Sequence, residues 1–151
     1  MEWKTRITKL FGCQYPILEG AYGNGKIGQW EFAKAISEAG ALGMITAGAC
    51  RTPERLRQNI RNYRDASDKP FVVNLSFGPC PRIDEMFEVC LEERVNIETA
   101  AYKPDVFAQR IKESGAMVVT PPAFVYYSGD RYLESVAQEA RRWLCPLASL
   151  L

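Results

Sequence analysis

The stretch 69–84 has the sequence Lys-Pro-Phe-Val-Val-Asn-Leu-Ser-Phe-Gly-Pro-Cys-Pro-Arg-Ile-Asp, and it indicates the fold most strongly. Phe71 to Val73 form an apolar strand that delivers one polar residue, Asn74, at its C-terminal end, and a Gly/Pro-rich loop and a helix follow. In α/β folds, ligands lie outside the carboxyl ends of the parallel strands. A side-chain amide there can donate and accept hydrogen bonds at once, which suits a heteroaromatic ligand. The alternative is an Asn that ties down its own loop.

Short apolar runs alternate with helical patterns along most of the chain. Near-continuous apolar strands separated by helices are typical of a parallel sheet covered by helices. The sequence therefore predicts an α/β fold with about five parallel strands. The expected strands are 16–20, 42–46, 71–75, 95–99 and 116–119. The expected helices are 29–39, 131–144 and those that begin at Pro53, Asp84 and Pro104.

The helix after the second strand has the clearest start. Thr52 is a good N-cap, and Pro53 suits the first helical position because its missing N–H would be unpaired there anyway. The inward face of this helix is expected to be Leu56, Ile60 and Tyr63.

Composition narrows the possible functions. The 151 residues are 47% apolar and 25% charged, which fits a soluble globular domain. The net charge of +1 does not favour nucleic acid or a membrane surface as a partner. The chain contains no histidine, which removes the commonest general base and metal ligand. Five cysteines without Cys-x-x-Cys spacing predict neither a disulfide framework nor a metal site.

The N-terminus is charged and is followed by no long apolar run, so it does not resemble a signal peptide. No stretch approaches the ~18 apolar residues of a membrane-spanning helix. A cytoplasmic location is therefore expected.

Two candidate ligand-binding segments, 19–22 and 23–28, lie at and after the end of the first expected strand. Residues 23–28 match the pattern G-x-G-x-x-G, but the second strand lacks the acidic residue that should hold a ribose, so a flexible loop over the strand ends is favoured. In Glu19-Gly20-Ala21-Tyr22, the small residues Gly20 and Ala21 let backbone amides face a flat ligand, and the alternative is a plain turn. Glu19 is either an acid–base group or, more commonly for a lone carboxylate, solvated.

Other chemically suggestive residues have simpler interpretations. The pairs Asp84-Glu85 and Glu92-Glu93 are expected to be charges at a helix N-terminus and on a solvated face. Cys80 would be a reactive thiol only if its pKa were lowered, and a sequence neighbour, Arg82, is weak support for that.

Taken together, these segments resemble the nitronate monooxygenase family, formerly called 2-nitropropane dioxygenases, and the related flavin-dependent enoyl-acyl-carrier-protein reductase. The most specific segment is 68–75, whose strand the family often ends as Gly-Val-Asn, and here Val72 replaces the Gly. The resemblance covers about residues 4–120. The other matching segments are 4–10, 15–17, 37–43, 52–54, 81–86 and 98–101.

The resemblance implies a TIM barrel that binds FMN at the C-terminal ends of its strands, through backbone at Gly20 and Ala21 and through Asn74. It also implies that electrons pass from a small-molecule substrate, a nitronate or a similar carbanion, to the flavin and then to oxygen. Many relatives have a Met where this chain has Tyr22. The family's catalytic His lies in a part that this chain does not match, so no catalytic residue is assigned.

A complete eight-stranded barrel typically takes about 250 residues. The expected organisation is therefore an incomplete (β/α)8 barrel over residues 1–120, followed by a divergent tail, 121–151, with one amphipathic helix. A premature stop or shifted reading frame after Thr120 would explain this, and the chain alone is expected to be weakly active or inactive. The alternatives are a non-catalytic half-barrel or interaction partner, and a flavodoxin-like FMN-binding domain. Exposed sheet edges would favour self-association.

Overall fold

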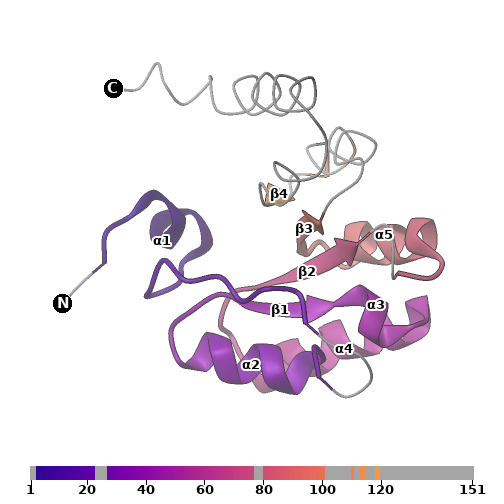
Figure 1. Cartoon of the computed structure of the whole chain (residues 1–151), viewed down its shortest axis with the longest axis horizontal. Coiled ribbons are helices and arrows are strands. Elements are labelled where there is room, and N and C mark those ends of the chain that lie inside the picture. Colours follow the sequence, from indigo (N-terminus) through magenta and orange to yellow (C-terminus); the bar gives the residue numbers. More distant parts are fainter. Residues whose placement is uncertain are drawn as a thin grey trace, which may run out of the picture. The chain divides into compact units, whose positions relative to one another are not determined.

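The computed structural model of the chain describes residues 3–22, 27–76, 80–100, 110, 113–114 and 118–119. Two compact units are distinguished, Met1–Pro121 and Pro122–Leu151, and all described residues lie in the first. The expected helices from Pro104 and over 131–144 lie outside the described residues. In chain order the elements are α1 (Arg6–Phe11), α2 (Trp30–Glu38), β1 (Gly43–Thr46), α3 (Ala47–Cys50), α4 (Pro53–Ala66), β2 (Phe71–Ser76), α5 (Ile83–Glu92), β3 (Asn96–Ala100) and β4 (Val118–Val119) (Figure 1).

The described strands form one parallel sheet in the order β1-β2-β3-β4. The first expected strand, 16–20, is reduced to a single parallel bridge between Leu18 and Leu42, so it lies beside β1. Each strand is thus the neighbour of the next one in the chain, as in a barrel. The flavodoxin-like alternative is wrong on this point, because that architecture orders its strands 2-1-3-4-5.

The two faces of the sheet have different partners, because successive side chains of a strand point to opposite sides. One face carries Ile45, Val73 and Ile97, and it packs against α2, α4 and α5 in the main hydrophobic core. The other face carries Met44 and Val72, which form a smaller cluster with Leu42, Cys13 and Phe11. In Figure 1, α2 and α4 accordingly lie on one side of the sheet and α1 on the other.

Helix α4 begins and packs as the sequence predicts. The hydroxyl of Thr52 accepts a hydrogen bond from the backbone N–H of Arg55 at 3.3 Å, and Pro53 is the first helical residue. The predicted inward face is confirmed, because Leu56, Ile60 and Tyr63 are fully buried. Each of the two aliphatic side chains contributes roughly 1.5–3 kcal/mol by leaving water.

Two helix starts differ from expectation. Asp84 does not cap α5: the N-cap is Arg82, in a left-handed conformation with φ 53°, and its carbonyl already accepts from Met86 N at 3.0 Å. Helix α1 was not expected, yet Thr5 and Thr8 form a reciprocal capping box at its start.

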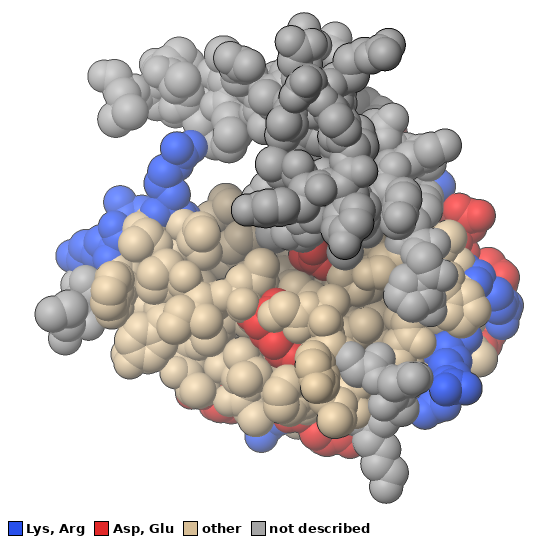
Figure 2. All heavy atoms as spheres, in the orientation of Figure 1, with Lys and Arg blue, Asp and Glu red and all other residues tan. Residues whose placement is uncertain are grey.

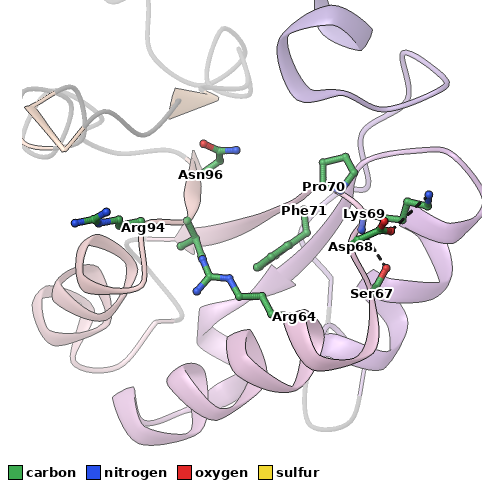
Figure 3. A pocket seen from close by; sticks show the side chains of 9 residues that line it. Arg64, Ser67, Asp68, Lys69, Pro70, Phe71, Arg94 and Asn96 are labelled. Carbon is green, nitrogen blue, oxygen red and sulfur yellow. Dashed lines mark hydrogen bonds and ion pairs between the residues drawn. The ribbon is translucent and has the colours of Figure 1, made fainter.

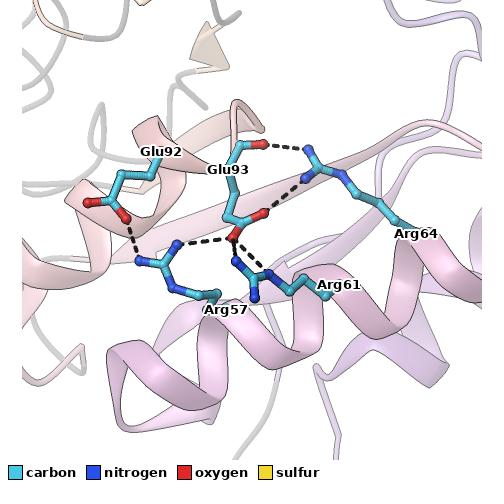
Figure 4. Close-up of polar contacts among 5 residues, drawn as sticks. All are labelled: Arg57, Arg61, Arg64, Glu92 and Glu93. Carbon is cyan, nitrogen blue, oxygen red and sulfur yellow. Dashed lines mark hydrogen bonds and ion pairs between the residues drawn. The ribbon is translucent and has the colours of Figure 1, made fainter.

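An ion-pair network joins α4 to the C-terminal end of α5 (Figure 4). The carboxylate of Glu93 receives Arg57, Arg61 and Arg64 at 3.0, 2.9 and 3.1 Å, and Arg57 also pairs with Glu92. The side chain of Glu93 is only 11% exposed, so the expectation of a solvated pair is wrong for this residue. Burial by itself raises the pKa of Glu93, but the hydrogen bonds from Arg57 and Arg61 hold that pKa below its usual value.

The face of the molecule in Figure 2 shows no broad basic band among the described residues. Figure 2 shows a largely uncharged face with acidic side chains near its middle and Lys and Arg toward its margins. No helix in the described part of the chain is both long enough and apolar enough to cross a membrane.

Replacing the network's central carboxylate tests how firmly α5 is attached to α4. We expect Glu93→Gln to lower the free energy of unfolding by about 1–2 kcal/mol, because three guanidinium groups lose their common, largely buried counter-charge. Glu92→Gln is the matched control, since Glu92 is 60% exposed and pairs with one Arg. Urea unfolding measures both, and equal effects of the two variants would contradict the central role of Glu93.

Candidate functional site

A row of polar side chains crosses three neighbouring strands, on the face of the sheet away from α2, α4 and α5; it includes the last residue of β1 and residues two positions before the ends of β2 and β3. Along that face, Met44 gives way to Thr46 in β1, and Val72 gives way to Asn74 in β2. The strand register pairs Thr46 with Asn74 and Asn74 with Glu98. These three residues are 8%, 0% and 3% exposed, respectively, so the row Thr46–Asn74–Glu98 is buried polar surface.

The amide of Asn74 is the centre of this row. Its Nδ2 donates to Oε2 of Glu98, and its Oδ1 accepts from the hydroxyl of Ser76 at 3.0 Å. An Asn amide has two N–H donors and two acceptor lone pairs. One donor and one lone pair therefore keep no partner among the described residues. Asn74 thus anchors its own strand end, and the ligand-binding interpretation of this residue stays a prediction.

Sequence reasoning assigned no role to Glu98. Burial raises the pKa of its carboxyl, and the hydrogen bond from Asn74 opposes that rise. A Glu is rarely buried unless it has a partner. The available signal was a single acidic residue in an otherwise uncharged strand, 96–100, but its partner became visible only once the register aligned it with Asn74.

Thr46, the last residue of β1, is hydrogen-bonded to Tyr22 and to Gly28, which lie on either side of residues 23–26. Its hydroxyl accepts from Tyr22 N and donates to Tyr22 O, both at 3.2 Å, and its backbone N–H donates to the carbonyl of Gly28 at 2.9 Å. Residues 23–26 lie outside the described residues.

Gly20 and Ala21 immediately precede this anchored position. Both are exposed, and a Cβ added at Gly20 would meet nothing within 4 Å. They lie at the same end of the sheet as Asn74, with Tyr22 and Thr46 as the connection, but no hydrogen bond among the described residues joins them to Asn74. The role of Gly20, Ala21 and Asn74 in holding a cofactor stays a prediction.

Glu19 is hydrogen-bonded to β1 and to the residue before it, through both its backbone and its side chain. Its backbone N–H donates to Leu42 O at 2.9 Å, and its Oε2 accepts from Met44 N at 2.8 Å. Its other oxygen, Oε1, is buried and has no hydrogen-bond partner. Burial raises the pKa of Glu19, although the hydrogen bond from Met44 opposes this. The expectation of a solvated carboxylate is therefore wrong for this residue.

The described cysteines do not form a reactive site. Burial raises the pKa of Cys80 to about 11 and that of Cys50 to about 12. A thiol with a raised pKa is a poor nucleophile near neutral pH, so a reactive Cys80 has no support. Among the described residues, no group of three His, Cys, Asp or Glu side chains is placed to hold a metal ion.

A separate hollow of about 390 Å³ lies at the other end of the strands (Figure 3). Its lining includes Phe71 and Asn96, which begin β2 and β3, together with Arg64 and Arg94. Its position at the N-terminal ends separates it from the polar row, so it does not enlarge the candidate site.

A parallel α/β sheet in sequential strand order, with buried polar groups at the carboxyl ends of its strands, is typical of the barrel architecture that binds ligands there. The nitronate monooxygenase family matches residues 4–136, and the chain belongs to this family. The match extends beyond Thr120, where the resemblance was expected to end.

Two curated proteins are similar to this chain over part of their length. The chain is 30% identical over 120 residues to the (3aS,4S,5R,7aS)-5-hydroxy-7a-methyl-1-oxo-octahydro-1H-indene-4-carboxyl-CoA dehydrogenase of Mycobacterium tuberculosis, covering 79% of this chain and 33% of that protein. It is 33% identical over 113 residues to a probable nitronate monooxygenase of Staphylococcus saprophyticus, covering 75% of this chain and 29% of that protein. The chain thus spans about a third of the length of the curated relatives it matches.

Solved structures give the same picture. FabK from Thermotoga maritima aligns with a TM-score of 0.71 and 35% identity, over 78% of this chain and 37% of that chain. A nitroalkane oxidase from Streptomyces ansochromogenes aligns with a TM-score of 0.62 over 77% of this chain and 42% of that chain, and its 20% identity supports the fold alone.

A pair of glycine variants tests the attachment of the glycine-rich segment. Gly28 has φ 84°, and a Cβ there would come within 1.9 Å of the carbonyl oxygen of Tyr22. Gly12 has a similar φ of 73° but open space around it. We expect Gly12→Ala to cost about 1 kcal/mol of unfolding free energy, from backbone strain alone, and Gly28→Ala at least about 2 kcal/mol more. Equal losses in urea unfolding would contradict the close approach at Gly28.

The two buried carboxyls predict an unusual pH dependence of stability. Because the pKa values of Glu19 and Glu98 are raised above 4.5, the native protein keeps protons that the unfolded chain releases. The free energy of unfolding should therefore fall as pH rises above about 4.5, until the native carboxyls have also lost their protons, with a slope of up to about 1.4 kcal/mol per pH unit for each group.

Glu19→Gln should flatten that slope. The control is Glu54→Gln, because hydrogen bonds from its own backbone N–H and from Thr52 hold the pKa of Glu54 below 4.5, so this variant should change the slope only at lower pH. Urea unfolding across the pH range measures both variants, and an unaltered slope in Glu19→Gln would show that this carboxyl is not buried in solution.

Proposed function

We propose that the chain is the flavin-binding part of an FMN-dependent oxidoreductase of the nitronate monooxygenase type, acting on a small carbanionic substrate such as a nitronate. The observation that carries the proposal is the buried row Thr46–Asn74–Glu98 at the carboxyl ends of the strands, the end where α/β barrels bind their ligands. Family membership supports the same function.

The residues present fit a flat heteroaromatic ring. Asn74 keeps one N–H and one lone pair for adjacent acceptor and donor atoms of such a ring. The open space at Gly20 lets a ring approach the backbone at Gly20 and Ala21. The unpartnered Oε1 of Glu19, next along the chain, is a further polar atom at this position. We propose that Gly20, Ala21 and Asn74 hold the isoalloxazine ring.

When bound, FMN supplies the electron-transfer chemistry between a carbanionic substrate and oxygen. The chain's own residues would bind the cofactor and orient it. Thr46 holds the backbone of Tyr22, and with it the segment after Gly20, against the end of β1. The carboxyl of Glu19, whose pKa burial raises, can retain a proton beside β1.

A second candidate function is favoured by the exposed apolar side chains of the N-terminal segment. Ile7, Leu10, Ile17 and Tyr22 are between 46% and 62% exposed. Apolar surface gathered in one segment commonly marks a contact with another chain. We therefore also propose that the chain self-associates or pairs with another half-barrel, in which case it would be an interaction partner that is weakly active or inactive alone.

Titration of the apoprotein with FMN, followed by flavin fluorescence, tests the cofactor proposal. We expect saturable quenching by the wild-type protein and at least tenfold weaker binding by Gly20→Val, because the new side chain fills the space through which the ring reaches the backbone. That variant should fold normally, since a Cβ at Gly20 meets nothing within 4 Å.

The matched control is Gly12→Val, which adds the same side chain at the end of α1. Its FMN affinity should equal that of the wild-type protein at a temperature where both are folded. Absence of FMN binding by the wild-type protein would refute the proposed cofactor, and equal affinity of Gly20→Val would refute the proposed site. Size-exclusion chromatography over a range of concentrations tests the proposed self-association. That proposal requires an associated species even without FMN.

A further inference from the structure

We propose that Glu98 is a positioning residue, which fixes the orientation of the Asn74 amide so that the same donor and acceptor always remain for the flavin. The inference rests on the proposed function of Asn74. Glu98 itself need not touch the cofactor, because it acts through the amide to which it is hydrogen-bonded.

The argument begins with the freedom of an Asn amide. Its last side-chain torsion is broad and roughly two-fold, so two orientations that exchange Oδ1 and Nδ2 have nearly the same shape. A ligand that requires a donor at one point and an acceptor at another binds only one of the two. Something next to the amide must therefore distinguish oxygen from nitrogen.

Ser76 cannot make that distinction. Its hydroxyl donates to Oδ1 of Asn74 at 3.0 Å, but a hydroxyl can equally accept from an N–H after the amide has turned over. Glu98 can make it at a pH above its raised pKa, because an ionised carboxylate only accepts hydrogen bonds. In the observed orientation its Oε2 receives Nδ2, whereas the reversed amide would place two acceptor oxygens against each other.

Burial strengthens this selection. Asn74 is 0% and Glu98 is 3% exposed, so little water is available to separate two opposed oxygens. The two residues are also direct partners in the parallel register of β2 and β3, which fixes their backbones relative to each other. Both strands therefore contribute to the orientation of one amide.

Substitutions at Glu98 have graded expected effects on FMN binding. In Glu98→Gln, the new amide can accept from or donate to Asn74, so both orientations become populated and the apparent affinity for FMN falls about twofold. In Glu98→Ala, the Asn74 amide loses its partner altogether, and the affinity should fall about tenfold or more. Ser76→Ala leaves the selecting carboxylate in place and should change the affinity less than Glu98→Ala does.

The decisive measurement is made on the FMN-free protein. The measurement is the difference in NMR chemical shift between the two Nδ2 protons of Asn74 in 15N-labelled protein, called the amide separation. These signals are assigned by their absence in Asn74→Leu. The amide separation should be large in the wild-type protein because one of the two protons bonds a carboxylate. We expect this separation to persist in Ser76→Ala and in Glu92→Gln, which removes an exposed carboxylate. It should shrink in Glu98→Gln and collapse in Glu98→Ala.

The outcomes separate the two proposals. If the wild-type protein binds FMN while Glu98→Ala keeps both the affinity and the amide separation, the positioning role is wrong and the proposed function stands. If the amide separation follows the prediction but no variant and no wild-type protein binds FMN, the cofactor proposal is wrong and the inference toward a flavin falls with it. Retained amide separation in Glu98→Gln, the variant of nearly unchanged shape, would also overturn the positioning role, even if Glu98→Ala fails to fold.

Discussion

The parallel register of β1, β2 and β3 is the constraint on which the candidate site depends. Because side chains alternate between the faces of a strand, that register places Thr46, Asn74 and Glu98 side by side, on the face away from α2, α4 and α5. A shift of one residue would move each of them to the opposite face. The hydrophobic contacts of Val73 and Ile97 with the helices on that opposite face therefore hold the polar row in place.

Burying such a row is acceptable only because its members are hydrogen-bonded to one another and to the backbone. A buried polar group without a partner costs about 1–3 kcal/mol. Thr46 satisfies both polar groups of the Tyr22 backbone, and Asn74 joins Ser76 to Glu98. Oε1 of Glu19 is an exception among the described side chains, since it is buried and unpartnered. Unused capacity at Asn74 and Glu19 is what makes this end of the sheet a candidate for ligand binding.

Sequence reasoning succeeded where local interactions dominate and failed where distant partners decide. Helix α4 was predictable because Thr52 and Pro53 act within its first turn and its inward face repeats at helical spacing. Glu93 was misjudged because its three arginines come from another helix. Asp84 was misjudged because the left-handed Arg82 starts α5 earlier than a capping pattern suggests.

The amino-acid sequence by itself determined the α/β class, the parallel strands, the placement of Asn74 at a strand end and the family to which the chain belongs. Each of these follows from patterns within a short segment or from the order of segments. Only the tertiary structure decided that Glu98 is the partner of Asn74, that Glu19 is bound to β1, and that Thr46 holds the backbone of Tyr22. These are contacts between strands or segments far apart in the chain, and the register that creates them is set by packing across the whole sheet.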